Sequence, residues 1–220
     1  MSGAAEQPES QLEVQLAPLI IEQPWATLRS VLTNRFSKVY DGYVSSGASP
    51  PNRIVREDVS VINRSMGTRS GYAQWEPLFR KRSFPALLQL DPAWDLLLIS
   101  DVAWAKAQVL DRVKLATNEI ARAGIGVAAV TKLLHIKRPA LMPVCDTDVL
   151  GRLGVTEREV ADQVERVCID LRREGRRLLP ELTELQGLAA GDLHVHVSLV
   201  RILEVLIWRS HPHRGGYRAT

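Results

Sequence analysis

Residues 123–152 read AGIGVAAVTKLLHIKRPALMPVCDTDVLGR and form the most informative segment of the sequence. Gly124, Ile125 and Gly126 stand between two segments in which apolar residues recur at helical spacing. Glycines permit a tight turn with positive φ, and the amides that open the following helix point outwards, where they attract an anion. The stretch therefore predicts a hairpin of two helices that holds a phosphate, although glycine is also the ordinary way to end a helix.

Apolar residues recur at helical spacing over most of the chain, which predicts an all-α fold. The pattern Thr156-Glu157-Arg158-Glu159 is typical of a capping box and predicts the start of a helix. Leu193, Val195, Val197 and Leu199 alternate like a strand, whereas Leu199 to Trp208 is nearly continuous apolar sequence. We expect a buried helix at 198–208, because a lone strand would have no partner in this chain. We expect one or two short helices in 16–32 and two in 85–100. Further helices are expected at 53–66, at 104–123, from 156 onwards and at 198–208. Loops are expected at 41–52 and 67–72.

The composition is that of an ordinary soluble globular chain, with 220 residues of which 45% are apolar and 24% charged. Residues 1–13 are polar and acidic, so we expect a disordered leader rather than a signal peptide. Residues 211–220 are expected to form a disordered tail, which leaves one domain at 14–210. No run of 18 apolar residues occurs, and we therefore expect a cytoplasmic, monomeric protein without a membrane span.

The sequence offers few ligands for a metal or cofactor. Two cysteines, Cys145 and Cys168, are too few for a four-cysteine zinc site or a cubane iron–sulfur cluster. His194 and His196 lie two residues apart, unlike the four-residue spacing of a helical metal pair. We therefore expect neither a metal site nor a cofactor.

Basic residues are concentrated between residues 51 and 82, although the net charge of the whole chain is only +3. Seven Arg and Lys residues, among them Arg80, Lys81 and Arg82, stand there against three acidic residues, with Tyr72 and Trp75 among them. Cations that contact phosphates and aromatic rings that stack on bases are typical of a surface that binds polynucleotides. An ordinary solvated surface remains the alternative.

The spacing between the hairpin and a later aspartate resembles that of a known enzyme superfamily. Gly126 lies twenty residues before Asp146, in the motif Val144-Cys145-Asp146-Thr147-Asp148-Val149. This arrangement resembles the helix-hairpin-helix DNA glycosylases, typified by endonuclease III, in which an apolar-Asp-Thr-His-apolar motif carries the catalytic aspartate. More narrowly, KLLHIKRPALMPVCD and SLVRILEVLIW resemble an uncharacterised, mainly actinobacterial family with no assigned function.

The resemblance implies a two-lobed, glycosylase-like helical bundle. A central lobe at about 53–155 would carry the hairpin, the N-terminal residues would pack with the C-terminal helices, and Asp146 would face the cleft between the lobes. Asp146 would then stabilise the oxocarbenium-like transition state of N-glycosidic hydrolysis, with the flipped base stacked on Tyr72 or Trp75. Asp148 replaces the usual histidine and is the fallback carboxylate.

One departure from the superfamily implies a monofunctional enzyme. Ala128 stands where the glycosylases that also cleave the strand carry a Schiff-base lysine. Lys132 lies one turn further on; we expect it to contact the nucleic acid, although a surface lysine without a function is the plain alternative.

Three classes of function remain open. Asp146 could serve only as a helix cap, and the protein would then bind DNA, the expected partner, without catalysis. The third class is an N-glycosidic hydrolase that acts on a free nucleoside-like metabolite.

Overall fold

The computed structural model describes residues 14–16, 19–21, 23–67, 70–121 and 124–210. Within these ranges the chain forms twelve helices and one antiparallel ribbon of two short strands, which confirms the predicted all-α fold. The expected leader at 1–13 and the expected tail at 211–220 lie outside the described residues.

The first part of the chain forms β1 (Val14–Leu16), β2 (Leu19–Ile21), α1 (Pro24–Leu32), α2 (Arg35–Ser45), α3 (Arg56–Ser65), α4 (Tyr72–Phe79), α5 (Pro85–Leu88) and α6 (Asp101–Lys106). The second part forms α7 (Val109–Ala121), α8 (Val127–Lys137), α9 (Thr147–Leu153), α10 (Val160–Arg177), α11 (Leu179–Leu193) and α12 (Leu199–Arg209).

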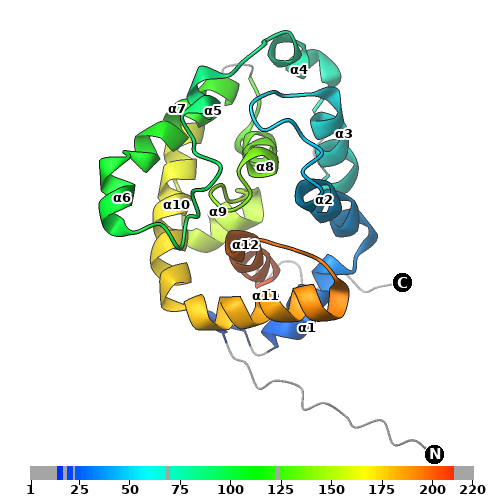
Figure 1. Ribbon diagram of the computed structural model, residues 1–220, viewed down its shortest axis with the longest axis vertical. Coiled ribbons are helices and arrows are strands. Elements are labelled where there is room, and N and C mark those ends of the chain that lie inside the picture. Colours follow the sequence, from blue (N-terminus) through cyan, green and yellow to red (C-terminus); the bar gives the residue numbers. More distant parts are fainter. Residues whose placement is uncertain (1–13, 17–18, 22, 68–69, 122–123, 211–220) are drawn as a thin grey trace, which may run out of the picture.

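Two helices, α8 and α12, form the centre of the molecule, and the other helices surround them (Figure 1). Helix α8 packs against α2, α3, α7 and α10, and α12 packs against α1, α9, α10 and α11. All residues from Ala129 to Lys137 and from Leu199 to Ile207 are buried. A helix that is apolar on most of its circumference is stable only when other elements cover it, and this explains why these two segments lie inside.

The N-terminal helix lies against the C-terminal part of the chain. Helix α1 contacts α11 and α12, and α2 contacts both α3 and α8. Of the N-terminal residues expected to pack with the C-terminal helices, α1 does so, whereas α2 packs mainly against α3.

The composition of residues 41–52 predicted a loop, but α2 continues to Ser45. The side chain of Asn34 caps α2 by accepting a hydrogen bond from the Phe36 N–H at 2.9 Å. Tyr40 and Asp41 are buried in the core. This packing outweighs the low helix propensity of glycine and serine, so the loop begins only after Ser45.

Three other helix boundaries differ from the sequence-based expectation. Residues 14–16 and 19–21 form strands, and the helix of that region starts only at Pro24, which suits the first helical turn. Gln108, with φ +50°, separates α6 from α7. The region 85–100 contains a single helix, α5, followed by turns.

The predicted capping box was wrong, whereas the predicted C-terminal helix is confirmed. Helix α10 begins at Val160 after Glu159, whose side chain makes no capping hydrogen bond. Helix α12 begins after Ser198, whose hydroxyl accepts a hydrogen bond from the Arg201 N–H at 3.1 Å.

Candidate functional site

The turn between α7 and α8 has the geometry expected of a hairpin that offers backbone amides to an anion. Gly124 adopts φ +73°, which only glycine adopts without strain, and Gly126 is the N-cap residue of α8. Ile125 is buried between them, whereas both glycines are exposed. The buried isoleucine holds the turn on the core, and the Val127 and Ala128 N–H groups in the first turn of α8 have no hydrogen-bond partner among the described residues.

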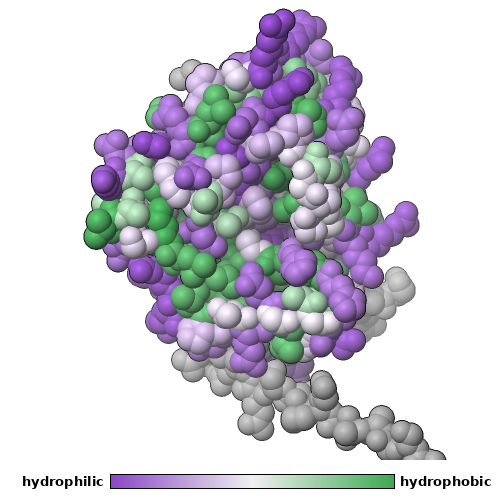
Figure 2. Space-filling model, in the orientation of Figure 1, coloured by the Kyte–Doolittle hydropathy of each residue, from purple (hydrophilic) through white to green (hydrophobic). Residues whose placement is uncertain are grey.

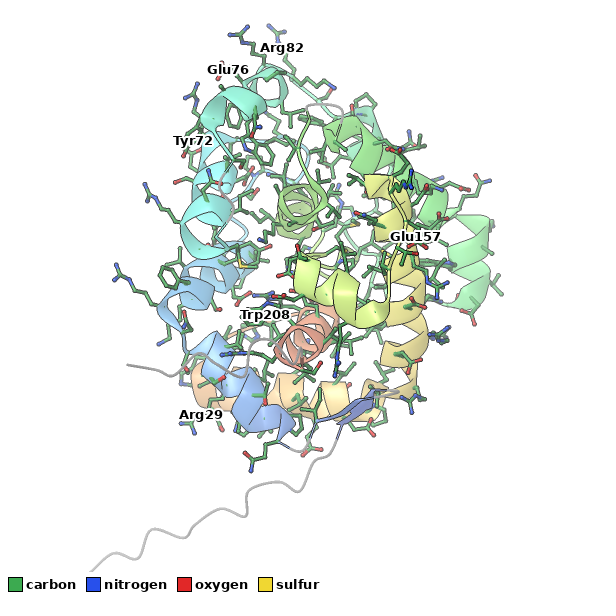
Figure 3. All side chains as sticks on the ribbon, turned by 180° about the vertical axis from the view of Figure 1, so that it is seen from behind. Arg29, Tyr72, Glu76, Arg82, Glu157 and Trp208 are labelled. Carbon is green, nitrogen blue, oxygen red and sulfur yellow. The ribbon has the colours of Figure 1, made fainter. Side chains whose placement is uncertain are left out.

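The basic segment that follows α4 lies beside this hairpin. The Lys81 ammonium is 3.6 Å from a carboxylate oxygen of Glu119, which lies in the last turn of α7. Glu119 also accepts a hydrogen bond from the Ala86 N–H at 3.1 Å, and this contact fixes the segment in place. Arg80, Lys81 and Arg82 are all exposed. Hydrophilic side chains cover the α4 end of the molecule in Figure 2, and Arg82 projects from it in Figure 3.

The two aromatic residues proposed to stack on a base differ in exposure. Tyr72 is 45% exposed and points outwards (Figure 3). Trp75 is fully buried, and its indole N–H donates to the Ser70 hydroxyl at 2.8 Å. The proposed stacking role of Trp75 is therefore wrong for this conformation, because the apolar face of α4 carries the indole into the core. Tyr72 keeps an accessible ring.

Lys132 was expected to contact nucleic acid, and the structure corrects this. Its side chain is only 5% exposed, and its ammonium donates to the carbonyl of Met66 at 2.8 Å. The lysine thus ties α8 to the end of α3. The Lys132 side chain is buried because α8 is surrounded by other helices.

Asp146 occupies the N-terminus of α9, close to α8. Its Oδ1 accepts hydrogen bonds from the Asp148 N–H at 3.1 Å and the Val149 N–H at 3.0 Å. The preceding Cys145 N–H donates to the Thr131 hydroxyl at 2.9 Å, which anchors the segment on α8. Asp146 is half-buried, and among the described residues its Oδ2 has no hydrogen-bond partner. Capping therefore uses one oxygen and leaves the other available for chemistry.

Asp148, the fallback carboxylate, has a different environment. Its Oδ2 accepts a hydrogen bond from the Trp208 indole N–H at 3.1 Å. This contact joins α9 to α12, and it makes Asp148 an anchor between two helices.

The thiols and the metal-binding residue types offer no reactive centre in the described part of the chain. Cys145 and Cys168 are free and fully buried, and burial raises the pKa of both thiols, that of Cys168 to about 12. No three His, Cys, Asp or Glu side chains of the described residues gather closely enough to hold a metal ion. No described helix is both long and apolar enough to cross a membrane.

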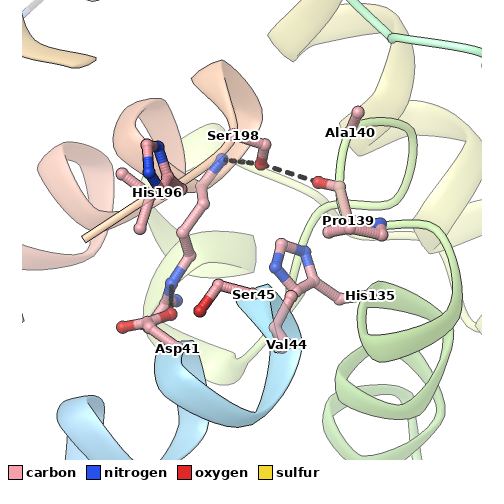
Figure 4. A pocket seen from close by; sticks show the side chains of 10 residues that line it. Asp41, Val44, Ser45, His135, Pro139, Ala140, His196 and Ser198 are labelled. Atoms are coloured by element: carbon pink, nitrogen blue, oxygen red, sulfur yellow. Dashed lines mark hydrogen bonds and ion pairs between the residues drawn. The ribbon is translucent and has the colours of Figure 1, made fainter. Parts of the chain in front are cut away.

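A pocket that no sequence pattern indicated lies at the other end of α8, with a volume of about 240 Å³ (Figure 4). Its polar lining comes from Asp41 and Ser45 of α2, His135 of α8, His196 in the loop before α12, and Ser198 and Arg201 at the start of α12. Asp146 is not among the lining residues. The lining comes from three separate parts of the chain that share no local motif, so only the tertiary structure reveals the site.

The pocket adjoins a buried group of charges. Arg201 Nε donates to Asp41 at 2.9 Å, and its Nη1 donates to Glu204. The second Glu204 oxygen accepts a hydrogen bond from the Val144 N–H at 2.5 Å. Burial raises the pKa of Glu204 to about 7, although Arg201 opposes this shift. The guanidinium also lies over the Tyr40 ring, 5.4 Å from its centroid.

A second buried ion pair stands nearby, between Lys137 and Asp58, whose side chains are both fully buried at 2.5 Å from each other. Asp58 also accepts hydrogen bonds from the Tyr43 hydroxyl, the Ser49 hydroxyl and the Val55 N–H. Every oxygen of Asp58 is therefore satisfied, and the pair joins α8 to α3 and to the loop after α2.

No curated protein and no solved structure matches the chain. One protein family matches residues 29–211, which include the hairpin, Asp146, the basic segment and the pocket. The chain therefore belongs to DUF6308, a family of unknown function.

Proposed function

We propose that this protein binds DNA through the hairpin of α7 and α8 and hydrolyses a base–sugar N-glycosidic bond with Asp146. The observation that carries the proposal is the joint placement of three features on one pair of helices. The exposed glycine turn, the Lys81 contact with α7 and the Thr131 anchor of the Asp146 segment all belong to α7 or α8.

The hairpin and the basic segment would bind the sugar–phosphate backbone. Amides at a helix N-terminus attract phosphate, and the adjacent Arg80, Lys81 and Arg82 add positive charge. Glu76 and Glu119 offset part of this charge through ion pairs with Arg80 and Lys81. Such contacts carry no base information, so binding is expected to tolerate any sequence and to weaken with salt.

Asp146 would act on a base turned out of the helix. Thr131 lies five residues after Gly126, which corresponds to roughly 7–8 Å along α8. A nucleotide whose phosphate rests on the hairpin can therefore present its sugar near the segment anchored on Thr131. The free Oδ2 of Asp146 would stabilise the oxocarbenium-like transition state and orient the attacking water; the base leaves and the sugar gains a hydroxyl. Tyr72 is the exposed ring available for stacking.

The proposed enzyme is monofunctional. Ala128 cannot form a Schiff base, and the Lys132 ammonium is buried against the Met66 carbonyl. Base release should leave an intact strand with an abasic site. The relation to the helix-hairpin-helix glycosylases, the two-lobed arrangement, the monomeric state and the cytoplasmic location belong to the same proposal.

Binding is tested by titrating labelled duplex, single-stranded and mismatched DNA at two salt concentrations. The triple variant Arg80→Ala, Lys81→Ala, Arg82→Ala should weaken binding and reduce the slope of log affinity against log salt by about 0.9 for each phosphate that it no longer neutralises. The matched control Arg29→Ala, Arg35→Ala, Lys38→Ala removes three exposed cations on α1 and α2; Arg29 lies at the opposite end from Arg82 (Figure 3). An equal effect of the two triple variants would contradict the proposed interface.

Catalysis is tested with duplexes containing damaged bases and with free nucleosides, using borohydride to trap any imine. Asp146→Asn should lower base release by about 10²-fold or more, because it removes the negative charge beside the cationic transition state. Asp148→Asn, which retains an acceptor for Trp208, should have the smaller effect. Equal release by the wild type and Asp146→Asn would exclude Asp146 from catalysis, and a trapped imine would contradict a monofunctional enzyme.

The same assays separate the other two classes of function. Salt-dependent binding without release of any base would indicate a non-catalytic DNA-binding protein. Release of a base from free nucleosides but not from DNA would indicate a hydrolase of small metabolites.

A further inference from the structure

Three of the polar side chains that line the pocket at the end of α8, those of Ser45, Ser198 and His135, donate their hydrogens to the backbone. The Ser45 hydroxyl donates to the Gly42 carbonyl at 3.2 Å, and the Ser198 hydroxyl donates to the Pro139 carbonyl at 2.7 Å. His135 Nδ1 lies 2.7 Å from the Met142 carbonyl, which can only accept, so this nitrogen carries the proton. Because these three groups donate their hydrogens to backbone carbonyls, they can act only as hydrogen-bond acceptors toward a ligand in the pocket.

The ring of His135 supplies the most specific of these acceptors. It is only 1% exposed, and in Figure 4 it points into the space bounded by Ser45, Ser198 and Pro139. Burial and the nearby Arg201 lower the pKa of His135 to about 3, so the ring is neutral at ordinary pH and its Nε2 is an acceptor. The described residues provide no hydrogen-bond partner for Nε2. Nε2 faces the pocket, so a ligand that occupies the pocket can donate a hydrogen bond to it.

The charges around the pocket disfavour an anion. Arg201 faces two carboxylates, those of Asp41 and Glu204, so the group has no excess of positive charge. The Arg201–Asp41 contact is itself part of the lining. Val44 and Val197 add apolar surface. A volume of about 240 Å³ is below the usual range for a drug-sized ligand and suits a compound with one ring.

We propose that this pocket, formed by α2, the turn after α8 and the start of α12, binds a small organic cation whose N–H groups donate to His135 Nε2 and Asp41. The apolar walls contact the body of the ligand, and the carboxylate of Asp41 complements its charge. This site is separate from Asp146, and the proposal does not depend on the glycosidic activity.

Three isosteric probes test the proposal: benzamidine is a planar cation with N–H donors, benzamide is its neutral counterpart, and benzoate is the anion. Isothermal titration calorimetry on the full chain should show binding of benzamidine, binding of benzamide weaker by about tenfold or more, and no binding of benzoate. Benzoate binding as tight as that of benzamidine would overturn the proposal, as would the absence of benzamidine binding at millimolar concentration.

A pair of neighbouring variants locates the site. Ser45→Leu places a bulky apolar side chain at the pocket and should weaken benzamidine binding by about tenfold or more. Ser46→Leu is the matched control, because Ser46 is exposed and does not line the pocket, and it should bind like the wild type. Equal affinity of Ser45→Leu and Ser46→Leu would place the cation elsewhere and overturn the assignment.

The ring nitrogens of His135 provide a direct signal. At pH 5 an ordinary imidazole is protonated, whereas His135 remains neutral, which distinguishes its ¹⁵N resonances. Benzamidine should shift the Nε2 resonance of His135 and leave Nδ1 nearly unchanged. Saturation by benzamidine without any shift of Nε2 would contradict the proposed hydrogen bond.

Discussion

The two ends of α8 differ in almost every physical respect. At the N-terminal end, Gly124 and Gly126 are exposed, and the Val127 and Ala128 N–H groups have no hydrogen-bond partner among the described residues. At the C-terminal end, every residue from Thr131 to Arg138 is buried, including His135 and Lys137. We call the N-terminal end of α8 the open end and its C-terminal end the closed end. Charges at the open end lie at the surface, where water solvates them. Charges at the closed end are buried and require protein partners.

Arg138 illustrates how the donors of a buried charge at the closed end are satisfied. Its guanidinium is buried and donates to the carbonyls of Leu87, Leu90 and Pro51 and to the Asn52 side chain. These acceptors lie in two separate parts of the chain, so one side chain joins both to α8. Removing a buried charge at the closed end should therefore alter stability, whereas removing exposed charges at the open end should alter DNA binding.

The largest effect is expected from Lys137→Met. Removing one member of a fully buried ion pair leaves Asp58 uncompensated and should lower the free energy of unfolding by about 3–5 kcal/mol. Urea denaturation measures this change. Lys114→Met is the control, because the Lys114 pairs with Asp162 and Glu165 are partly exposed and should contribute far less to stability. An equal reduction of the free energy of unfolding in Lys137→Met and Lys114→Met would contradict the predicted difference between buried and exposed ion pairs.

The neutral ring of His135 makes stability depend on pH. Its pKa is lowered to about 3 in the fold, against about 6.5 in an unfolded chain, so the unfolded state binds the additional proton between these values. Its contribution is complete above pH 6.5 and is lost as the pH falls towards 3, by about 3 kcal/mol between pH 6.5 and 4. The difference between the wild type and His135→Gln, measured by urea denaturation at several pH values, isolates this contribution. If the free energies of unfolding of the wild type and His135→Gln differ by the same amount at every pH, the predicted contribution of His135 is contradicted.

Glu204 should act in the opposite direction. Its pKa is raised to about 7 in the fold, so between pH 4.5 and 7 the folded state holds the additional proton. Its contribution is complete below pH 4.5 and is lost as the pH rises through 7, by about 3 kcal/mol. Subtracting the Glu204→Gln curve from that of the wild type should show this fall. In the wild type the two groups oppose each other, and the His135 and Glu204 slopes should nearly cancel between pH 4.5 and 6.5.

A smaller effect is expected at the open end, from Gly124→Ala. A side chain at φ +73° is strained, and the free energy of unfolding should fall by about 1–2 kcal/mol. Gly126→Ala should cost less, because Gly126 has a negative φ and an added Cβ meets nothing within 4 Å. Thermal and urea unfolding of the two variants measure the difference. A larger reduction for Gly126→Ala would show that the turn is held by something other than the conformation of Gly124.

The smallest effect on stability is expected from the triple variant Arg80→Ala, Lys81→Ala, Arg82→Ala. These side chains are exposed, and removing them should change the free energy of unfolding by about 0.5 kcal/mol or less for each position. The melting temperature checks this, and DNA affinity should change far more. Marked destabilisation would show that the basic segment stabilises the fold in the way that the closed end does.

The helical class and several elements follow from the sequence alone. The periodicity of apolar residues predicted α3, and the nearly continuous apolar run of α12 correctly indicated a buried helix. Gly124 and Gly126 marked the end of α7 and the start of α8. These features follow from local physics, since side-chain spacing, capping and the conformations of glycine act over a few residues.

Which polar side chains are buried depends on the packing of helices that are distant in the sequence. The sequence around Trp75 and Lys132 suggested a binding surface, but packing placed both side chains inside. Arg201 and Asp41 are 160 positions apart in the chain, and their pairing depends on α2 lying beside α12. A charged residue in a sequence is by default a surface residue, because burial without a partner is costly. The partner is supplied by another helix, and the sequence around either residue carries no sign of it.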